Sequence, residues 1–303
     1  MRPRTELVIE RGVLMLTKEE FQQKIQEGVR ILDGATGSNL RAAGMPKGCC
    51  TEQWVLENPE PLVALQRAYA AAGSQIIYAP TFQAQPIALK TVGMDAQTEK
   101  INEALVALSR SAAPGCLIAG DLTTLAVYCE SWNPDCFDLL VENYRRQIRG
   151  LIDGGADLLI GETLLYAQEA EAILTAAELE GAGATMYTFT MQSDGALFSG
   201  ADSGKVLHDL EAAGAAAVGF NCVAADVLTP HLVSKLRRSV KIPLVCKPNA
   251  GIPTINDQGA AEYAQSAEEF TEIMLQCRDN GATLLGGCCG TTPAFIAALV
   301  EAL

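Results

Sequence analysis

The sequence is poor in the features that mark a membrane protein, a nucleic-acid-binding protein or a histidine-based active site. No apolar run approaches the roughly 18 residues that a membrane span requires. Lysine and arginine number 22 against 36 aspartate and glutamate residues, and the net charge of -14 argues against nucleic acid or an anionic membrane as a partner. The two histidines, His208 and His231, do not follow apolar runs, so we expect them on helices or at the surface rather than in a site.

Targeting and linker segments are also lacking. Basic residues open the chain, but Glu6 and Glu10 interrupt the stretch that follows, and no cleavable signal is evident. We therefore expect a cytoplasmic protein. No low-complexity segment divides the 303 residues, so we expect a short N-terminal extension over residues 1–16 and one domain over residues 17–303. Thr17 and Glu20 have the spacing of a capping box, which predicts a helix before the first strand.

Eight short apolar runs alternate with amphipathic stretches along this domain. A run of this kind fits a strand that is buried on both faces of a parallel sheet. Stretches with helical spacing, such as residues 61–71 and 137–152, lie between most of the runs. The alternation predicts an α/β fold, a single (β/α)8 TIM barrel with a short N-terminal helical extension, and an open doubly wound sheet is the alternative. The runs are residues 29–32, 75–78, 117–119, 158–160, 186–189, 217–220, 243–246 and 283–285.

Three of the ten cysteines follow predicted strands. Cys222 comes directly after the sixth apolar run, and Cys288 and Cys289 come shortly after the eighth. The C-terminal ends of barrel strands share one rim, and strand seven alone separates strands six and eight. Three thiolates at that rim can hold zinc with its fourth position open, which is typical of a catalytic site. The glycines on either side of the Cys288-Cys289 pair free the backbone to turn both cysteines toward one metal.

The other cysteines carry no predicted metal role. In a cytoplasmic chain of this size, cysteines indicate free thiols more than disulfides. Three of them lie in apolar surroundings and are expected in the core: Cys116, Cys246 and Cys277. Four lie in predicted loops: Cys49, Cys50, Cys129 and Cys136.

Four segments at the predicted strand ends resemble the homocysteine S-methyltransferase family. This family includes betaine–homocysteine and S-methylmethionine-dependent enzymes and the N-terminal domain of cobalamin-dependent methionine synthase. The resemblance covers about residues 17–303, and its most specific element is the Gly-Gly-Cys-Cys-Gly sequence together with the upstream Asn-Cys pair. The segments are Asp33-Gly34-Ala35-Thr36-Gly37, Glu162-Thr163, Gly219-Phe220-Asn221-Cys222 and Gly286-Gly287-Cys288-Cys289-Gly290-Thr291-Thr292-Pro293.

The resemblance implies a zinc-bearing barrel with an amino-acid site beside the metal. Cys222, Cys288 and Cys289 match the zinc ligands of the family. Asp33 and Glu162 match carboxylates that pair with the ammonium group of the bound amino acid, and Asn221 matches the residue before the first ligand; we expect these three to bind substrate. The stretch 247–253, Lys-Pro-Asn-Ala-Gly-Ile-Pro, is most similar to the methionine synthase branch.

The activity that the resemblance implies is transfer of a methyl group to the thiol of homocysteine, which gives methionine. Because the sequence ends at Leu303 without a folate-binding or cobalamin-binding module, we expect a methylcorrinoid donor to arrive on a partner protein. The alternative donor is a small cation, S-methylmethionine or a betaine, which Tyr128 and Trp132 could bind through their ring faces. Segments 78–82 and 120–124 depart from the family pattern, which leaves the thiol and the donor open.

Two further alternatives remain at this stage. The chain could be a zinc-binding redox sensor whose thiolates are themselves the reactive groups. It could also be a corrinoid-dependent demethylase that moves methyl groups to a thiol other than homocysteine. Retention of Asp33 and Glu162 at the rim favours the homocysteine enzyme over the sensor.

Overall fold

Eight parallel strands form the centre of the computed structural model, which describes residues 15–26, 28–192, 194–256 and 261–303. The strands in this part of the chain follow the order β1-β10-β7-β6-β5-β4-β3-β2. Each of the eight predicted apolar runs supplies one of them. They are β1 (Arg30–Ile31), β2 (Ile76–Tyr78), β3 (Leu117–Thr123), β4 (Leu158–Leu164), β5 (Thr185–Phe189), β6 (Ala217–Ala224), β7 (Leu244–Asn249) and β10 (Leu284–Leu285).

The sheet closes on itself. An isolated parallel bridge pairs Leu32, just after β1, with Ile76 in β2, and the Gln75 amide donates to the Ile31 carbonyl at 2.7 Å. These contacts join the two strands at the ends of the strand order. The fold is therefore the predicted (β/α)8 barrel, and the open doubly wound sheet is excluded.

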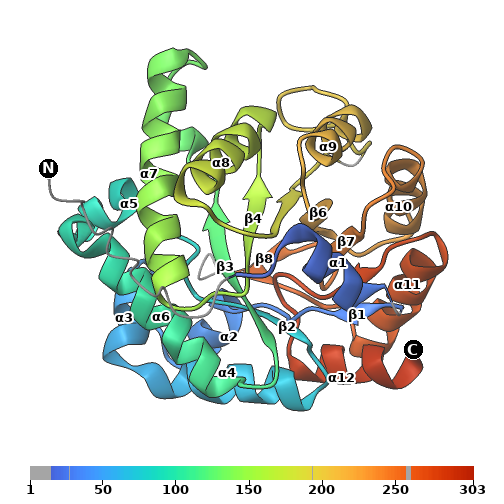
Figure 1. The fold of residues 1–303 in the computed structure, drawn as a ribbon. Coiled ribbons are helices and arrows are strands. Elements are labelled where there is room, and N and C mark those ends of the chain that lie inside the picture. The colour runs from blue at the N-terminus through green and yellow to red at the C-terminus, as the bar shows by residue number, and fades with distance from the viewer. Residues whose placement is uncertain (1–14, 27, 193, 257–260) are drawn as a thin grey trace, which may run out of the picture.

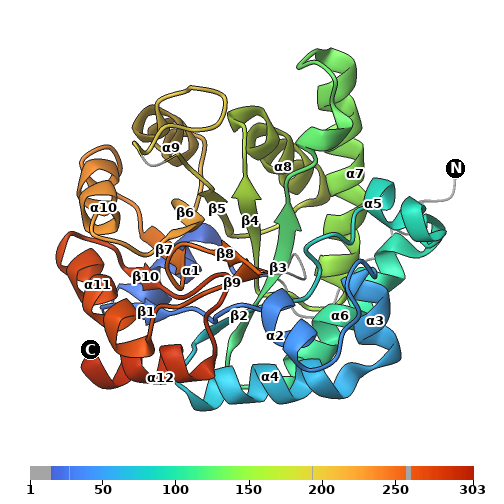
Figure 2. The ribbon, with the colours of Figure 1, turned by 180° about the vertical axis from the view of Figure 1, so that it is seen from behind.

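Helices surround the barrel, as Figure 1 and the reverse view in Figure 2 show. Most strands are followed by one long helix, and the connections after β1 and β2 carry additional short ones. The helices after strands β1 to β3 are α2 (Gly37–Ala42), α3 (Thr51–Glu57), α4 (Pro59–Ala71), α5 (Pro86–Leu89), η1 (Lys90–Val92), η2 (Asp95–Gln97), α6 (Thr98–Ala112), η3 (Ala126–Tyr128) and α7 (Pro134–Asp153). Those after β4 to β10 are α8 (Ala167–Glu180), α9 (Ser203–Ala212), α10 (Thr229–Arg237), α11 (Ala267–Asp279) and α12 (Pro293–Ala302).

Helix α1 (Lys18–Ile25) closes the N-terminal end of the barrel. Thr17 and Glu20 form the predicted capping box, each side chain bonding the backbone amide of the other. Phe21 and Ile25 are buried and belong to the same apolar cluster as side chains from inside the barrel, such as Leu32, Ile160 and Met186. The predicted extension over residues 1–16 falls largely on residues 1–14, which lie outside the described residues.

A small hairpin interrupts the alternation after β7. Strands β8 (Thr254–Ile255) and β9 (Ala261–Glu262) pair in antiparallel fashion and lie on the side of the barrel where the strands end. Figure 2 shows the hairpin in front of the central strands. None of the described helices is long and apolar enough to cross a membrane.

Candidate active site

A cavity of about 330 Å³ opens at the C-terminal ends of the barrel strands. Its lining combines sulfur atoms, carboxylates and one buried ammonium group, drawn from β1, β3, β4, β6, β7 and the segment after β10. The lining residues that matter below are Asp33, Arg41, Tyr78, Asp121, Glu162, Thr163, Cys222, Lys247, Cys288 and Cys289.

The three predicted cysteine ligands converge in this cavity. The Sγ atoms of Cys222, Cys288 and Cys289 lie within 4.8 Å of one another. Cys222 adopts the left-handed backbone conformation, with φ of 57°, which a non-glycine residue rarely does. Cys288 is fixed by its amide, which donates to the Pro248 carbonyl at 2.7 Å. Three converging thiols are a ligand set for one soft or borderline metal ion, with room left for a further ligand.

Glycine is required beside the cysteine pair. Gly290 has φ of 84°, and a Cβ atom there would collide with the ring of Tyr263. This close approach lets the Tyr263 hydroxyl hydrogen-bond to Cys289 from the segment after β9. Tyr263 is therefore a neighbour of the metal site that the sequence pattern did not identify.

The thiols of the cluster differ in acidity. Hydrogen bonds from Cys222 and Cys288 lower the pKa of Cys289 to about 3. Its hydrogen bonds to Cys288 and Cys289 raise the pKa of Cys222 instead. The first negative charge of the cluster therefore belongs to Cys289, and this charge attracts a metal cation.

Asn221 lies behind the cluster rather than in the cavity lining. Its side chain is fully buried; the amide oxygen accepts from the Thr163 amide at 2.9 Å, and the amide nitrogen donates to Thr163 Oγ1 at 2.7 Å. The same nitrogen lies 3.8 Å from the Sγ of Cys288. Thr163 also has a left-handed backbone, with φ of 58°. Asn221 thus ties the end of β4 to β6 and to one thiol.

A buried ion-pair cluster forms the opposite wall of the cavity. Lys247 is 3% exposed, and its Nζ atom lies 3.5 Å from Asp33 Oδ1 and 3.4 Å from Glu162 Oε1. The same atom lies 4.7 Å from the centre of the Tyr78 ring, close enough for a cation–π contact. Burial disfavours the charged form of Lys247, but Glu162 and Asp33 outweigh it and raise its pKa well above the ordinary lysine value.

The carboxyl groups of this wall are more basic than in water. Burial raises the pKa of Asp33 to about 6, although Lys247 and the Tyr78 amide favour its ionised form. Burial also raises the pKa of Glu162, and burial followed by the Glu162 charge raises the pKa of Asp121 well above the ordinary value. One lysine is therefore too little positive charge for three carboxyl groups, and the wall can accept another cation.

The comparisons with known proteins agree with this geometry. The sequence pattern of the family described as homocysteine S-methyltransferase matches residues 30–303. The chain belongs to the homocysteine S-methyltransferase family. It is therefore a methyltransferase.

Two relatives in this family illustrate how much of the chain is shared. Homocysteine S-methyltransferase of Escherichia coli is 29% identical over 300 residues, which cover 90% of this chain and 95% of that protein. The crystal structure of the homocysteine methyltransferase MmuM from Escherichia coli, in a metallated form, superposes with a TM-score of 0.78 at 28% identity, covering 92% of this chain and 97% of that one. A metallated relative and the converging cysteines together indicate a metal site here.

A methionine synthase is also similar, but over a part of its length. The Mycobacterium tuberculosis enzyme is 26% identical over 300 residues, covering 92% of this chain. The present chain spans about a quarter of that relative, 25% of its length.

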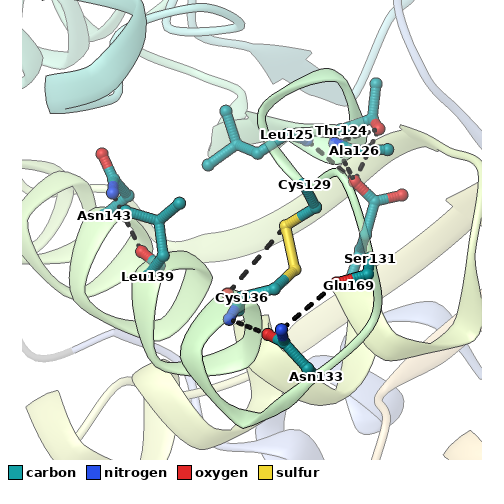
Figure 3. The surroundings of a disulfide bond; sticks show 10 residues. All are labelled: Thr124, Leu125, Ala126, Cys129, Ser131, Asn133, Cys136, Leu139, Asn143 and Glu169. Atoms are coloured by element: carbon teal, nitrogen blue, oxygen red, sulfur yellow. Dashed lines mark hydrogen bonds between the residues drawn. A yellow bond between two sulfur atoms is a disulfide. The ribbon is translucent and has the colours of Figure 1, made fainter.

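The connection between β3 and α7 lies beside the cavity and is held by two devices, shown in Figure 3. Cys129 and Cys136 form a disulfide, so the expectation that these two are free thiols was wrong. The buried Glu169 of α8 accepts hydrogen bonds from the Thr124 hydroxyl and from the amides of Leu125 and Ala126. These bonds attach the loop to the neighbouring barrel helix.

The loop presents aromatic rings at the rim in this member of the family. Trp132 lies against Tyr166 with ring centroids 4.8 Å apart and planes tilted by 49°. Tyr128 and Trp132 are both partly exposed. The two histidines lie on α9 and α10, as expected, and neither lines the cavity.

Proposed function

We propose that this methyltransferase holds zinc with Cys222, Cys288 and Cys289 and transfers a methyl group to the thiol of homocysteine, giving methionine. The observation that carries the proposal is the convergence of the three Sγ atoms within 4.8 Å in the same cavity as the charged wall of Asp33, Glu162 and Lys247. A thiol group and an amino-acid head group can thus be bound together in one cavity. We place the enzyme in the cytoplasm, with residues 17–303 as its catalytic domain.

The donor set suits zinc. Three cysteine thiolates and one open position are a ligand arrangement that zinc accepts in catalytic sites. When bound, zinc stabilises the deprotonated form of a substrate thiol, which is the reactive nucleophile. The protein's own residues then position the substrate: the negative wall attracts its ammonium group, and Arg41, which lines the same cavity, supplies a guanidinium for its carboxylate.

We propose a methylcorrinoid carried by a partner protein as the donor. The segments that follow the strand ends expose a set of large apolar side chains around the cavity mouth, a feature that favours a protein partner over a free small donor. The similarity of residues 247–253 to the methionine synthase branch supports the same choice. The exposed side chains are Val127, Trp132, Phe198, Val227, Leu228, Ile252 and Ile255. The tilted Trp132–Tyr166 pair favours a small cationic donor as the second candidate.

Turnover with single donors tests the acceptor and the donor. Zinc-loaded protein is incubated with homocysteine and with one donor at a time: a methylated corrinoid protein, S-methylmethionine, a betaine or methyltetrahydrofolate. We expect methionine, read by mass spectrometry, with the corrinoid protein alone. Fast turnover with S-methylmethionine or a betaine would overturn the choice of donor, and absence of methionine with every donor would overturn homocysteine as the acceptor.

We further propose that Asn221 positions the metal ligands instead of contacting substrate directly. Asn221→Ala removes the amide that spans Thr163 and Cys288, so we expect zinc affinity to fall by about 10- to 100-fold, the usual effect of losing a partner of a metal ligand. Competition with a chromogenic chelator measures the change. Asn143→Ala is the matched control, because Asn143 also accepts a backbone amide, that of Ile87, away from the cavity. Equal zinc affinity in the two variants would exclude this role.

A further inference from the structure

Lys247 occupies the place where the family pattern puts the substrate ammonium group. Asp33 and Glu162 are the two carboxylates expected to pair with that group, and the Nζ atom of Lys247 lies between them at 3.5 Å and 3.4 Å. The Tyr78 ring faces the same ammonium group at 4.7 Å. The protein therefore fills this position with its own cation.

A third carboxyl group lies next to the filled position. Asp121, at the end of β3, is 4% exposed and lines the cavity. Its carboxyl group is within hydrogen-bonding reach of Glu162. Its Oδ1 atom is buried and has no hydrogen-bond partner among the described residues. A buried carboxylate oxygen without a donor is costly unless a ligand supplies one.

The backbone holds Asp121 rigidly in this position. Its amide accepts no freedom, because it donates to Thr81 Oγ1 at 3.0 Å. Its carbonyl accepts from the Thr81 hydroxyl at 2.9 Å and from the Gln147 amide at 3.0 Å. The side chain is thus directed by bonds that leave its carboxyl group unused, which is the arrangement expected of a prepared binding residue.

We propose that the ammonium group of the acceptor binds between Glu162 and Asp121, with Lys247 retained between Glu162 and Asp33. This assignment rests on the proposed function, because it concerns the head group of the thiol amino acid. The charges then alternate along the wall as Asp33, Lys247, Glu162, substrate ammonium and Asp121. Each cation lies between two carboxylates, and no two like charges are adjacent.

The alternative position requires Lys247 to leave. An acceptor ammonium between Asp33 and Glu162 would displace a lysine that is 3% exposed from both of its carboxylates and from the Tyr78 ring. A buried ammonium group without a partner is strongly unfavourable. The position beside Asp121 requires no such displacement.

The test compares two thiols that differ by one amino group. Homocysteine and 4-mercaptobutanoate are titrated into zinc-loaded protein in a calorimeter. We expect wild type to prefer homocysteine, and Asp121→Asn to weaken homocysteine binding by about 10- to 100-fold while leaving 4-mercaptobutanoate unchanged. Asp33→Asn should keep the preference for homocysteine. Zinc content and thermal melting, measured for each variant, show that the site is intact.

The double variant Asp121→Asn with Lys247→Met gives an independent check. Removing Lys247 opens the space between Asp33 and Glu162, so the preference for homocysteine lost in Asp121→Asn should return. Loss of the preference in Asp33→Asn with its retention in Asp121→Asn would overturn the assignment, as would a wild type that binds both thiols equally. The proposed function fails on a different result, the absence of methionine in the donor experiment with wild type.

Discussion

Replacing Cys222, Cys288 or Cys289 singly with alanine is expected to remove most of the bound zinc and to abolish methyl transfer. The wild-type protein should bind about one zinc ion per chain, because its three Sγ atoms converge within 4.8 Å. Loss of an outer partner of a ligand already weakens metal sites by about 10- to 100-fold, so loss of a ligand should exceed that. Elemental analysis after dialysis and methionine formation measure the two effects.

Cys116→Ala is the matched control for this experiment. Cys116 is also a free cysteine, but it is buried at the start of β3, and its thiol donates to the Ser74 carbonyl at 3.1 Å. This variant should keep its zinc. Retention of a full equivalent of zinc in all three ligand variants would show that the metal, if bound, lies elsewhere.

The barrel itself was predictable because its evidence is local. Each strand is a short apolar run whose neighbours along the chain are turn residues and amphipathic segments, so the order of elements can be read directly from the sequence. That order then brings the ends of β6 and β10 to one rim, with β7 between them. The cysteine cluster followed from this order, since Cys288 and Cys289 are adjacent and Cys222 ends a neighbouring strand.

The charged wall could not be predicted from the same evidence. The contacts of Lys247 join β7 to β1 and β4, and they depend on which side of the strand the lysine faces. A shift of one residue in register would turn this side chain away from Asp33 and Glu162. A lysine and an aspartate directly after apolar runs, at 247 and 121, were a signal that strand ends alone could not distinguish from ordinary polar termini.

The disulfide illustrates a different limit. Cys129 and Cys136 are seven residues apart, and nothing in that spacing fixes how the connection between β3 and α7 folds. Asn133 caps α7 by accepting the Cys136 amide at 2.9 Å, which begins the helix at the residue where the second cysteine can meet the first. The expectation of free thiols came from the assumed compartment and not from this local geometry.

Lys247→Met is expected to destabilise the protein by about 3–5 kcal/mol at neutral pH, because it removes one partner of a buried ion-pair cluster. Lys247 is 3% exposed and is the cation nearest to both Asp33 and Glu162. Without it, these carboxylates and Asp121 must either stay ionised in a buried site or take up protons. Urea unfolding of the zinc-free protein measures the loss, and zinc-free samples remove the separate effect of pH on metal binding.

The loss should grow as the pH rises. Burial already raises the pKa of Asp33 to about 6 in the presence of Lys247, and removing the lysine raises it further. A carboxyl group whose pKa is higher in the folded state than in the unfolded chain binds more protons when folded, so stability falls as the pH rises from about 4 through the folded pKa. The variant should therefore be close to wild type at pH 5 and furthest from it at pH 8.

Lys205→Met separates this effect from the loss of any lysine. Lys205 forms an exposed ion pair with Asp209 on the surface of α9, and such pairs contribute less than about 1 kcal/mol. Its removal should change the free energy of unfolding little at either pH. If Lys247→Met behaved like Lys205→Met, or if its deficit shrank from pH 5 to pH 8, Lys247 would not be the cation that balances the buried carboxylates. The wall would then have to hold its charge in another way, and the ammonium position between Asp33 and Glu162 would be open to the substrate.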